Sequence, residues 1–387
     1  MACMDTVEIM KNSIPKVLFF YQSGRKERLS NKQEYAKEMF YGYHFFNDKN
    51  YKTDIVEFNS HKTIFGKYFF LIFEKRLRNY LKLPLYWSFL NNKNNLRKIF
   101  EYDYAIFSNN RMGCSALPML LIAKIFNKKI TSLCFVMGLF SRTPKYKLLQ
   151  FIQKVYIKIF LNELNYLVFL SEGEFNFAKK NFPKYKNKYS FIPFAVDLTL
   201  WKSNFAQEQE KKYILFVGND GNRDYRLAEN ISKKLSNEKF LYVSELIDKN
   251  NIDSNSQLIS GSWGSPAIDD LELRNIYQNA KLTIIPLKDS LQPSGQSVAL
   301  QSIACGTPVI ITYTSGFWDK KNFKNKKNIF FAENNKIETW IEIINSILNM
   351  EKNDLVKLTE NGIDVVLNNY DLKVFNEKIE FLITKET

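Results

Sequence analysis

The sequence predicts an α/β fold made of two doubly wound, Rossmann-like domains. Three observations lead to this prediction. Short apolar runs alternate with helical patterns, as in parallel sheets that are covered on both faces. The alternation restarts after a polar stretch at residues 202–212. The length of 387 residues is long for one domain and comfortable for two.

The first half contains six predicted strands. Apolar runs that end in polar or glycine residues indicate them at 16–20, 54–58, 104–107, 130–136, 166–170 and 191–193. Helical patterns between these runs predict helices over 31–47, 115–126 and 145–161. Together these elements make up a predicted first domain of residues 1–198.

The second half repeats this alternation. Its predicted strands lie at 213–217, 239–243, 257–259, 282–285 and 308–312, and its helices at 226–235, 337–350 and 371–383. They form a predicted second domain of residues 199–387, whose last helix is placed to pack back on the first domain. Because doubly wound sheets bind ligands beyond the carboxyl ends of their strands, the functional residues are expected just after strands.

The net charge of +15 is distributed unevenly. Residues 1–200 hold 32 Lys and Arg against 15 Asp and Glu, which gives +17, and residues 201–387 hold 23 against 25, which gives −2. The asymmetry indicates that the first half faces something anionic, such as a membrane surface or a phosphorylated acceptor. No nucleic-acid motif accompanies it, so nucleic acid is not an expected partner.

Cysteine and histidine usage argues against a metal site. The four cysteines form no Cys-x-x-Cys pair, and the two histidines are too few for a multi-histidine site. The beginning of the chain does not have the pattern of a signal peptide, and no apolar run approaches the roughly 20 residues of a bilayer helix. We expect a cytoplasmic protein and leave open a peripheral attachment to the inner face of the membrane.

Two segments of the basic half are candidates for that attachment. Residues 67–98 mix aromatic residues with eight Lys and Arg and one Glu, and residues 145–161 place Leu148, Ile152 and Val155 at helical spacing among lysines. Both fit an amphipathic helix that lies at an anionic lipid surface. The alternative is an ordinary helix that buries its apolar side and exposes its lysines to solvent.

The most informative stretch lies at residues 286–318. Pro293, Ser294 and Gly295 indicate a turn, and a helix is expected to follow over 296–304, capped by Ser294 or Ser297. A Ser- and Gly-rich turn that opens a helix after a strand offers free backbone N–H groups and the positive end of the helix dipole. It is therefore a natural diphosphate site, although a capped helix between two strands also occurs for structural reasons alone.

Four stretches in order resemble the GT-B glycosyltransferases of the large retaining family four. LQSIACGTPVI at 300–310 is similar to the donor-site helix of that family, and the other matching stretches are 194–201, 216–225 and 273–280. The resemblance covers about a third of the chain and implies two domains that face each other across a cleft. From the residues themselves, we expect Trp201 to pack at the hinge and Cys305 to be a small buried residue, because nothing nearby would activate its thiolate.

The resemblance also implies roles for individual residues. Arg223 would bind the donor diphosphate and Gln301 the nucleotide ribose, and both are the candidate catalytic residues. The implied donor-binding set is Gly218, Asn219, Arg223, Asp224, Ser294, Gly295, Gln296, Ser297 and Gln301, and the acceptor side is Gly24, Met137 and Gly138. Pro293 and Gln301 replace the two acidic residues of the family, and Asn219 replaces a phosphate-binding cation. The alternatives are a surface ion pair of Arg223 with Asp224 and an exposed Gln301.

The leading functional hypothesis is a retaining, metal-independent glycosyltransferase without a cofactor. It would move a sugar from a UDP- or GDP-sugar to a lipid-linked or saccharide acceptor, in the synthesis of cell-envelope polysaccharide, lipopolysaccharide or glycolipid. One alternative is an epimerase or hydrolase of sugar nucleotides on the same scaffold. The other is a non-catalytic basic binding protein with a degenerate donor site.

Overall fold

The computed structural model describes residues 14–31, 33–58, 65–204, 210–261 and 268–385, and the side chains from residue 70 onward in the third of these ranges. Two separate parallel sheets of six strands form its centre. The first consists of β1 (Lys16–Tyr21), β2 (Lys52–Glu57), β3 (Tyr104–Phe107), β4 (Thr131–Val136), β5 (Tyr166–Phe169) and β6 (Tyr189–Phe191). The second consists of β7 (Tyr213–Val217), β8 (Phe240–Val243), β9 (Ser256–Ile259), β10 (Ala280–Ile285), β11 (Val309–Thr312) and β12 (Phe330–Ala332). Most of these strand residues are buried, which explains why apolar runs predicted the strands, whereas the edge strands β2, β6 and β9 are mostly half-buried or exposed.

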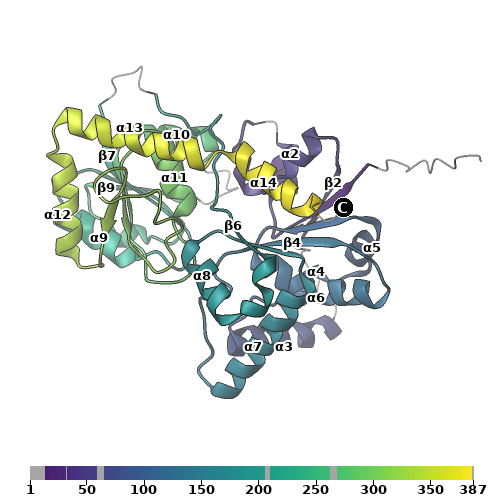
Figure 1. The fold of residues 1–387 in the computed structure, drawn as a ribbon. Coiled ribbons are helices and arrows are strands. Elements are labelled where there is room, and N and C mark those ends of the chain that lie inside the picture. Colours follow the sequence, from purple (N-terminus) through teal and green to yellow (C-terminus); the bar gives the residue numbers. More distant parts are fainter. Residues whose placement is uncertain (1–13, 32, 59–64, 205–209, 262–267, 386–387) are drawn as a thin grey trace, which may run out of the picture.

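Helices cover both sheets (Figure 1). Those that follow strands of the first sheet are α1 (Arg25–Ser30), η1 (Glu38–Phe40), α2 (Tyr43–Asp48), α3 (Phe65–Leu81), α4 (Trp87–Leu90), α5 (Lys93–Glu101), α6 (Asn110–Ile125), α7 (Lys147–Glu163), α8 (Glu172–Asn181) and η2 (Pro183–Lys188). Those that follow strands of the second are α9 (Tyr225–Lys234), η3 (Lys249–Asn251), α10 (Asp270–Asn279), α11 (Gln296–Ala304), α12 (Ile337–Leu348), α13 (Lys352–Asn369) and α14 (Leu372–Thr384).

The strand order of each sheet reverses direction at one place. The first sheet runs β2-β1-β3-β4-β5-β6, and the second runs β12-β11-β10-β7-β8-β9. The neighbours at the reversal are β1 and β3 in the first sheet, and β7 and β10 in the second. Loops that leave such neighbours on opposite faces open a crevice at the carboxyl edge of the sheet. Each sheet therefore provides one crevice of this kind.

One hydrophobic core joins the two units. It includes Phe19 of β1, Trp201 of the connecting segment and Tyr277 of α10. Separate cores fill the space behind each sheet. The last helix, α14, returns to the first sheet, where the Phe375 ring stacks on Phe135 of β4 with ring centroids 5.6 Å apart. Figure 1 shows α13 and α14 crossing from the second unit to the first in yellow.

The structure corrects the prediction of one helix over residues 31–47. The segment forms η1 and α2 instead, after α1 has ended at Ser30. Tyr41 and Gly42 adopt left-handed backbone angles, with φ of 48° and 101°, and this conformation interrupts a helix. The sequence analysis also missed α13, which lies between two helices that it predicted.

Candidate functional site

A cavity of about 280 Å³ lies between the two units, at the reversal point of the second sheet. β7 leads into one wall, and α11, which follows β10, forms another. We call it the inter-sheet cavity. Five residues of the predicted donor-binding set line it, namely Gly218, Asn219, Arg223, Ser297 and Gln301.

Arg223 supplies the positive charge of the inter-sheet cavity. Its side chain is 3% exposed, and its Nη1 atom lies 2.9 Å from Oδ2 of Asp220. Gly218 makes room for it, because a Cβ atom at that position would lie 2.5 Å from Nε of Arg223. The ion pair with Asp220 replaces the surface pair with Asp224 that one interpretation of the sequence expected. A guanidinium held here can bind an oxyanion with charge-assisted hydrogen bonds.

Helix α11 begins without a capping side chain. Gly295 occupies the N-cap position with φ of 80°, so the expected cap by Ser294 or Ser297 is wrong. A Cβ atom on Gly295 would also lie 2.9 Å from Cγ2 of Ile285. The Ser294 hydroxyl instead accepts a hydrogen bond of 2.7 Å from Nδ2 of Asn222. The first N–H groups of α11 thus have no side-chain acceptor within the described structure, an arrangement that suits a bound anion.

Gln296 has a different role from the other residues at this helix start. It is 5% exposed, and its Nε2 donates a hydrogen bond to the carbonyl oxygen of Leu170, which follows β5 in the first unit. The contact ties the start of α11 to the first sheet. The side-chain amide nitrogen of Gln296 is therefore engaged within the protein.

Gln301 and Glu38 form a buried pair between the two units. Nε2 of Gln301 donates to Oε1 of Glu38 at 2.9 Å, and Nε1 of Trp201 donates to the same oxygen at 2.7 Å. The Tyr277 hydroxyl donates to Oε1 of Gln301 at 3.3 Å. Gln301 is 6% exposed, so it is not the exposed helix residue of the alternative interpretation.

Glu38 is a buried carboxyl group of this cavity that the sequence analysis did not single out. It is 1% exposed, and burial raises its pKa to about 7, although hydrogen bonds from Gln301 and Trp201 act in the opposite direction. Its second oxygen accepts from the backbone N–H of Asp197 at 3.3 Å. Glu38 thus adds a titratable carboxyl group to the cavity that Gln301 also lines.

Two predicted donor residues use their side chains to hold the local structure. Asn219 donates to the carbonyl of Gly261 at 2.7 Å and accepts from the N–H of Glu245 at 2.6 Å. Asp224 caps α9, because its Oδ1 accepts from the N–H of Leu227 at 3.2 Å. Both side chains are therefore engaged within the protein, although Asn219 also lines the inter-sheet cavity.

Met137 and Gly138 line a second cavity, of about 360 Å³, which we call the cationic cleft. The backbone N–H of Gly138 donates to Glu174 at 2.8 Å, and burial raises the pKa of this fully buried carboxyl to about 7. Gly138 has φ of 92°, and a Cβ atom there would lie 2.9 Å from Oε1 of Gln292. The two units therefore meet closely at the edge of the cleft.

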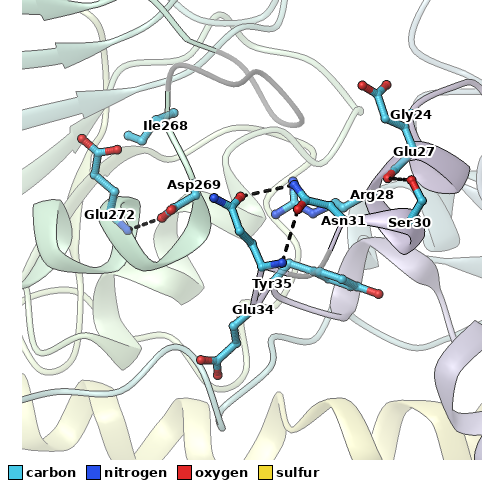
Figure 2. Close-up of a pocket in the computed structure, with 11 residues that line it drawn as sticks. Gly24, Glu27, Arg28, Ser30, Asn31, Glu34, Tyr35, Ile268, Asp269 and Glu272 are labelled. Carbon is cyan, nitrogen blue, oxygen red and sulfur yellow. Dashed lines mark hydrogen bonds between the residues drawn. The ribbon is translucent and has the colours of Figure 1, made fainter.

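Gly24, the third predicted acceptor residue, lies in a different cavity. This acidic cavity, of about 600 Å³, opens between α1 and the start of α10 (Figure 2). Its lining includes the carboxylates of Glu27, Glu34, Asp269 and Glu272, with Arg28 as the one basic residue among its described lining. Figure 2 shows the carboxyl groups of Glu34 and Glu272 pointing away from each other. It is the largest of the three cavities by volume.

No group of three His, Cys, Asp or Glu side chains within the described ranges is arranged to hold a metal ion. Likewise, none of the described helices is long and apolar enough to cross a bilayer.

The apolar side of α7 faces solvent. Leu148 is 70% exposed, Phe151 66% and Ile152 40%, while Ile157 and Phe160 of the same helix are buried. The neighbouring helix α3 adds exposed Phe70, Phe73 and Tyr80 beside Lys75 and Arg76, and lysines 145, 147, 154 and 158 surround the α7 residues. We call this area the α3–α7 surface. The stripe of Leu148, Ile152 and Val155 that the sequence analysis named is thus exposed, while another side of α7 packs against the protein.

The comparisons with known proteins agree with this arrangement. Residues 265–365 match the family model described as glycosyl transferases group 1. No curated protein matches the chain in sequence. Among solved structures, a glycosyltransferase from Rickettsia africae is 14% identical with a TM-score of 0.64, and the match covers 96% of this chain and 99% of that one.

Two further solved structures are similar over nearly their whole length. HepE from Anabaena, in complex with UDP and glucose, is 11% identical with a TM-score of 0.62 and coverage of 96% and 99%. A TarM variant from S. aureus, in complex with fondaparinux, alpha-GlcNAc-glycerol and UDP, is 12% identical with a TM-score of 0.63 and coverage of 95% and 99%. The chain thus has the GT-B fold of these glycosyltransferases, as its sequence predicted.

Proposed function

We propose that this protein is a glycosyltransferase that uses a nucleotide-activated sugar, with UDP as the first nucleotide to test and GDP as the second. The observation that carries the proposal is the inter-sheet cavity, where the buried Arg223 guanidinium lies beside the uncapped start of α11. Together they offer fixed positive charge and free N–H groups to a diphosphate. The UDP in the similar HepE and TarM structures supports this choice of nucleotide.

In the proposed reaction, an acceptor hydroxyl attacks the anomeric carbon of the donor sugar. The bond from that carbon to the diphosphate oxygen breaks, and the hydroxyl proton leaves with the diphosphate. Attack on the face of the departing group retains the anomeric configuration and needs no nucleophile from the enzyme. Arg223 would stabilise the charge that develops on the leaving diphosphate, a task that requires neither a metal nor a cofactor.

We further propose that the acceptor is a lipid-linked or saccharide molecule of the cell envelope, reached from the cytoplasmic face of the membrane. The α3–α7 surface supports this proposal, because exposed Phe and Leu side chains among lysines match the boundary of an anionic bilayer. Sedimentation with anionic and neutral vesicles tests it. We expect the Phe151→Ser variant to bind anionic vesicles several-fold less, and Phe381→Ser, an equally exposed phenylalanine on α14, to bind as the parent does.

Thermal shift with UDP, GDP and ADP tests the donor site. We expect one nucleotide to raise the melting temperature, and Arg223→Gln to abolish that rise. Arg226→Gln is the matched control, since Arg226 is exposed and lies outside the described lining of the inter-sheet cavity. If none of the three nucleotides stabilises the parent protein, the proposal of a nucleotide-sugar enzyme is wrong.

A further inference from the structure

The cationic cleft lies at the reversal point of the first sheet. Gln22 follows β1, Asn109 and Asn110 follow β3, and Met137 follows β4, so the carboxyl ends of these strands form its floor. This is the crevice where a doubly wound sheet binds ligands. Gln292, from the loop that leads to α11, closes one side. The cleft therefore faces the second unit and its donor cavity.

Four cations line this cleft. They are Arg78, Lys82, Arg111 and Arg142, and no Asp or Glu is part of the described lining. Only Arg78 has a carboxylate partner in the described structure, the buried Glu74 at 2.8 Å. The acidic cavity, by contrast, is lined by four carboxylates and one arginine. The concentration of positive charge in the cationic cleft attracts an anion of at least two charges.

Two of the arginines, Arg78 and Arg111, are held in place by contacts within the protein. Nη1 of Arg78 donates to Glu74 and, at 2.9 Å, to the carbonyl of Leu85, and its guanidinium lies 4.1 Å from the ring centre of Tyr86. Arg111 lies 5.2 Å from the same ring and contacts the side-chain amide of Gln22. Two guanidinium groups against one ring repel each other, and an oxyanion that accepts hydrogen bonds from both would relieve this repulsion.

We propose that the cationic cleft binds the phosphate or pyrophosphate group of the acceptor, so that this protein glycosylates a phosphate-bearing molecule. The inference rests on the proposed glycosyltransferase function and specifies its acceptor class. The guanidinium fork matches the tetrahedral oxygens of phosphate, and a space of about 360 Å³ accommodates a pyrophosphate with one sugar at most. The start of α6, whose N-cap is Asn109, adds N–H groups at the same edge.

The test measures pyrophosphate binding by calorimetry on the full chain saturated with UDP, so that the donor cavity is filled. We expect pyrophosphate to bind, and Arg111→Gln and Arg142→Gln each to weaken it about tenfold, the usual effect of losing one charge-assisted hydrogen bond. Both arginines are exposed, so the variants should fold. Arg97→Gln, an exposed arginine on α5 outside the described lining, should bind like the parent.

A second arm separates the two sources of the phosphate. Dodecyl phosphate in phosphatidylcholine vesicles presents a lipid-borne group, and glucose 1-phosphate presents a soluble one. If one probe binds more strongly than the other, and Arg111→Gln abolishes this binding, the result supports the proposal and shows whether the phosphate is borne by a lipid or by a soluble molecule. Equal binding of pyrophosphate by the parent, Arg111→Gln and Arg142→Gln would overturn it, as would no binding of pyrophosphate to a parent that binds UDP. No binding of UDP, GDP or ADP would instead refute the proposed function.

Discussion

Replacement of Glu38 by Gln tests whether the inter-sheet cavity holds a carboxyl group with a strongly raised pKa. Burial raises this pKa from 4.5 to about 7. The folded protein therefore binds a proton more tightly than the unfolded chain does. The stability that protonated Glu38 contributes is complete below about pH 4.5 and is lost as the pH rises to about 7. At about 1.4 kcal/mol for each pH unit, the loss amounts to about 3 kcal/mol.

The amide of the Glu38→Gln variant does not titrate, so it escapes this loss. Its oxygen can still accept from Nε1 of Trp201 and Nε2 of Gln301. Its NH₂ group faces the N–H of Asp197, and this donor–donor contact costs about 1–3 kcal/mol at every pH. The substitution thus lowers the free energy of unfolding by the same amount at every pH through the donor–donor contact. It also removes the loss of stability that ionisation of Glu38 causes, and only this second effect depends on pH.

Urea unfolding at pH 5, 6, 7 and 8 measures the difference in free energy of unfolding between variant and parent. We expect this difference to change by about 2–3 kcal/mol in favour of the variant over that range. Glu360→Gln, an exposed carboxylate on α13, is the control and should show a constant difference. If the Glu38→Gln difference is also constant, Glu38 titrates normally and its proposed burial as a neutral acid is refuted.

Three further predictions follow from individual contacts. Gly295→Ala should lower the free energy of unfolding by about 1–3 kcal/mol, because φ is 80° there and the new Cβ atom would lie too close to Ile285. Gly221→Ala, where a Cβ atom would enter open space, should lower it much less. Urea unfolding of both variants measures the difference. Asp224→Ala removes a helix cap, so it should lower the free energy of unfolding by about 1 kcal/mol without changing the affinity for UDP. Asp224→Asn should retain the cap and the stability. A loss of UDP affinity in Asp224→Asn would show that Asp224 contacts the donor directly. Burial raises the pKa of all three described cysteines, so a thiol reagent should modify them only after the protein unfolds. Mass spectrometry of the native and the unfolded protein after treatment tests this expectation.

The sequence predicted the sheets because their signal is local. A strand buried on both faces appears as a continuous apolar run, and the runs at 16–20, 104–107 and 213–217 correspond closely to β1, β3 and β7. In a doubly wound sheet, cavities form beyond the carboxyl ends of the strands. Residues just after predicted strands, such as Gly218, Arg223 and Met137, therefore line cavities in the structure. Their roles toward a donor or an acceptor stay predictions.

Glu38 could not be found in this way because its partners are remote in the chain. Its carboxyl meets Trp201 and Gln301, which are 163 and 263 residues further along. The surrounding segment, moreover, has the composition of a helix, although left-handed backbone at Tyr41 and Gly42 divides it. Glu174 differs from Glu38 because its position in a helix can be predicted locally. Ser171, three residues earlier, is a typical N-cap, and its hydroxyl accepts from the backbone N–H of Glu174. Nothing local indicates that its carboxyl would hold the backbone of Gly138.

The location of the excess charge makes the proposals mutually consistent. The first half carries +17, yet the largest cavity that it borders is acidic, so its cations must act elsewhere. The structure concentrates them along the α3–α7 surface and in the cationic cleft, and the two are adjacent because Arg78 belongs to α3 and Arg142 lies five residues before α7 begins. A phosphate carried by a membrane lipid would meet both in succession, first the surface and then the cleft. A soluble phosphorylated acceptor would need only the cleft, so dependence of turnover on both Phe151 and Arg111 would distinguish the membrane-bound acceptor from the soluble one.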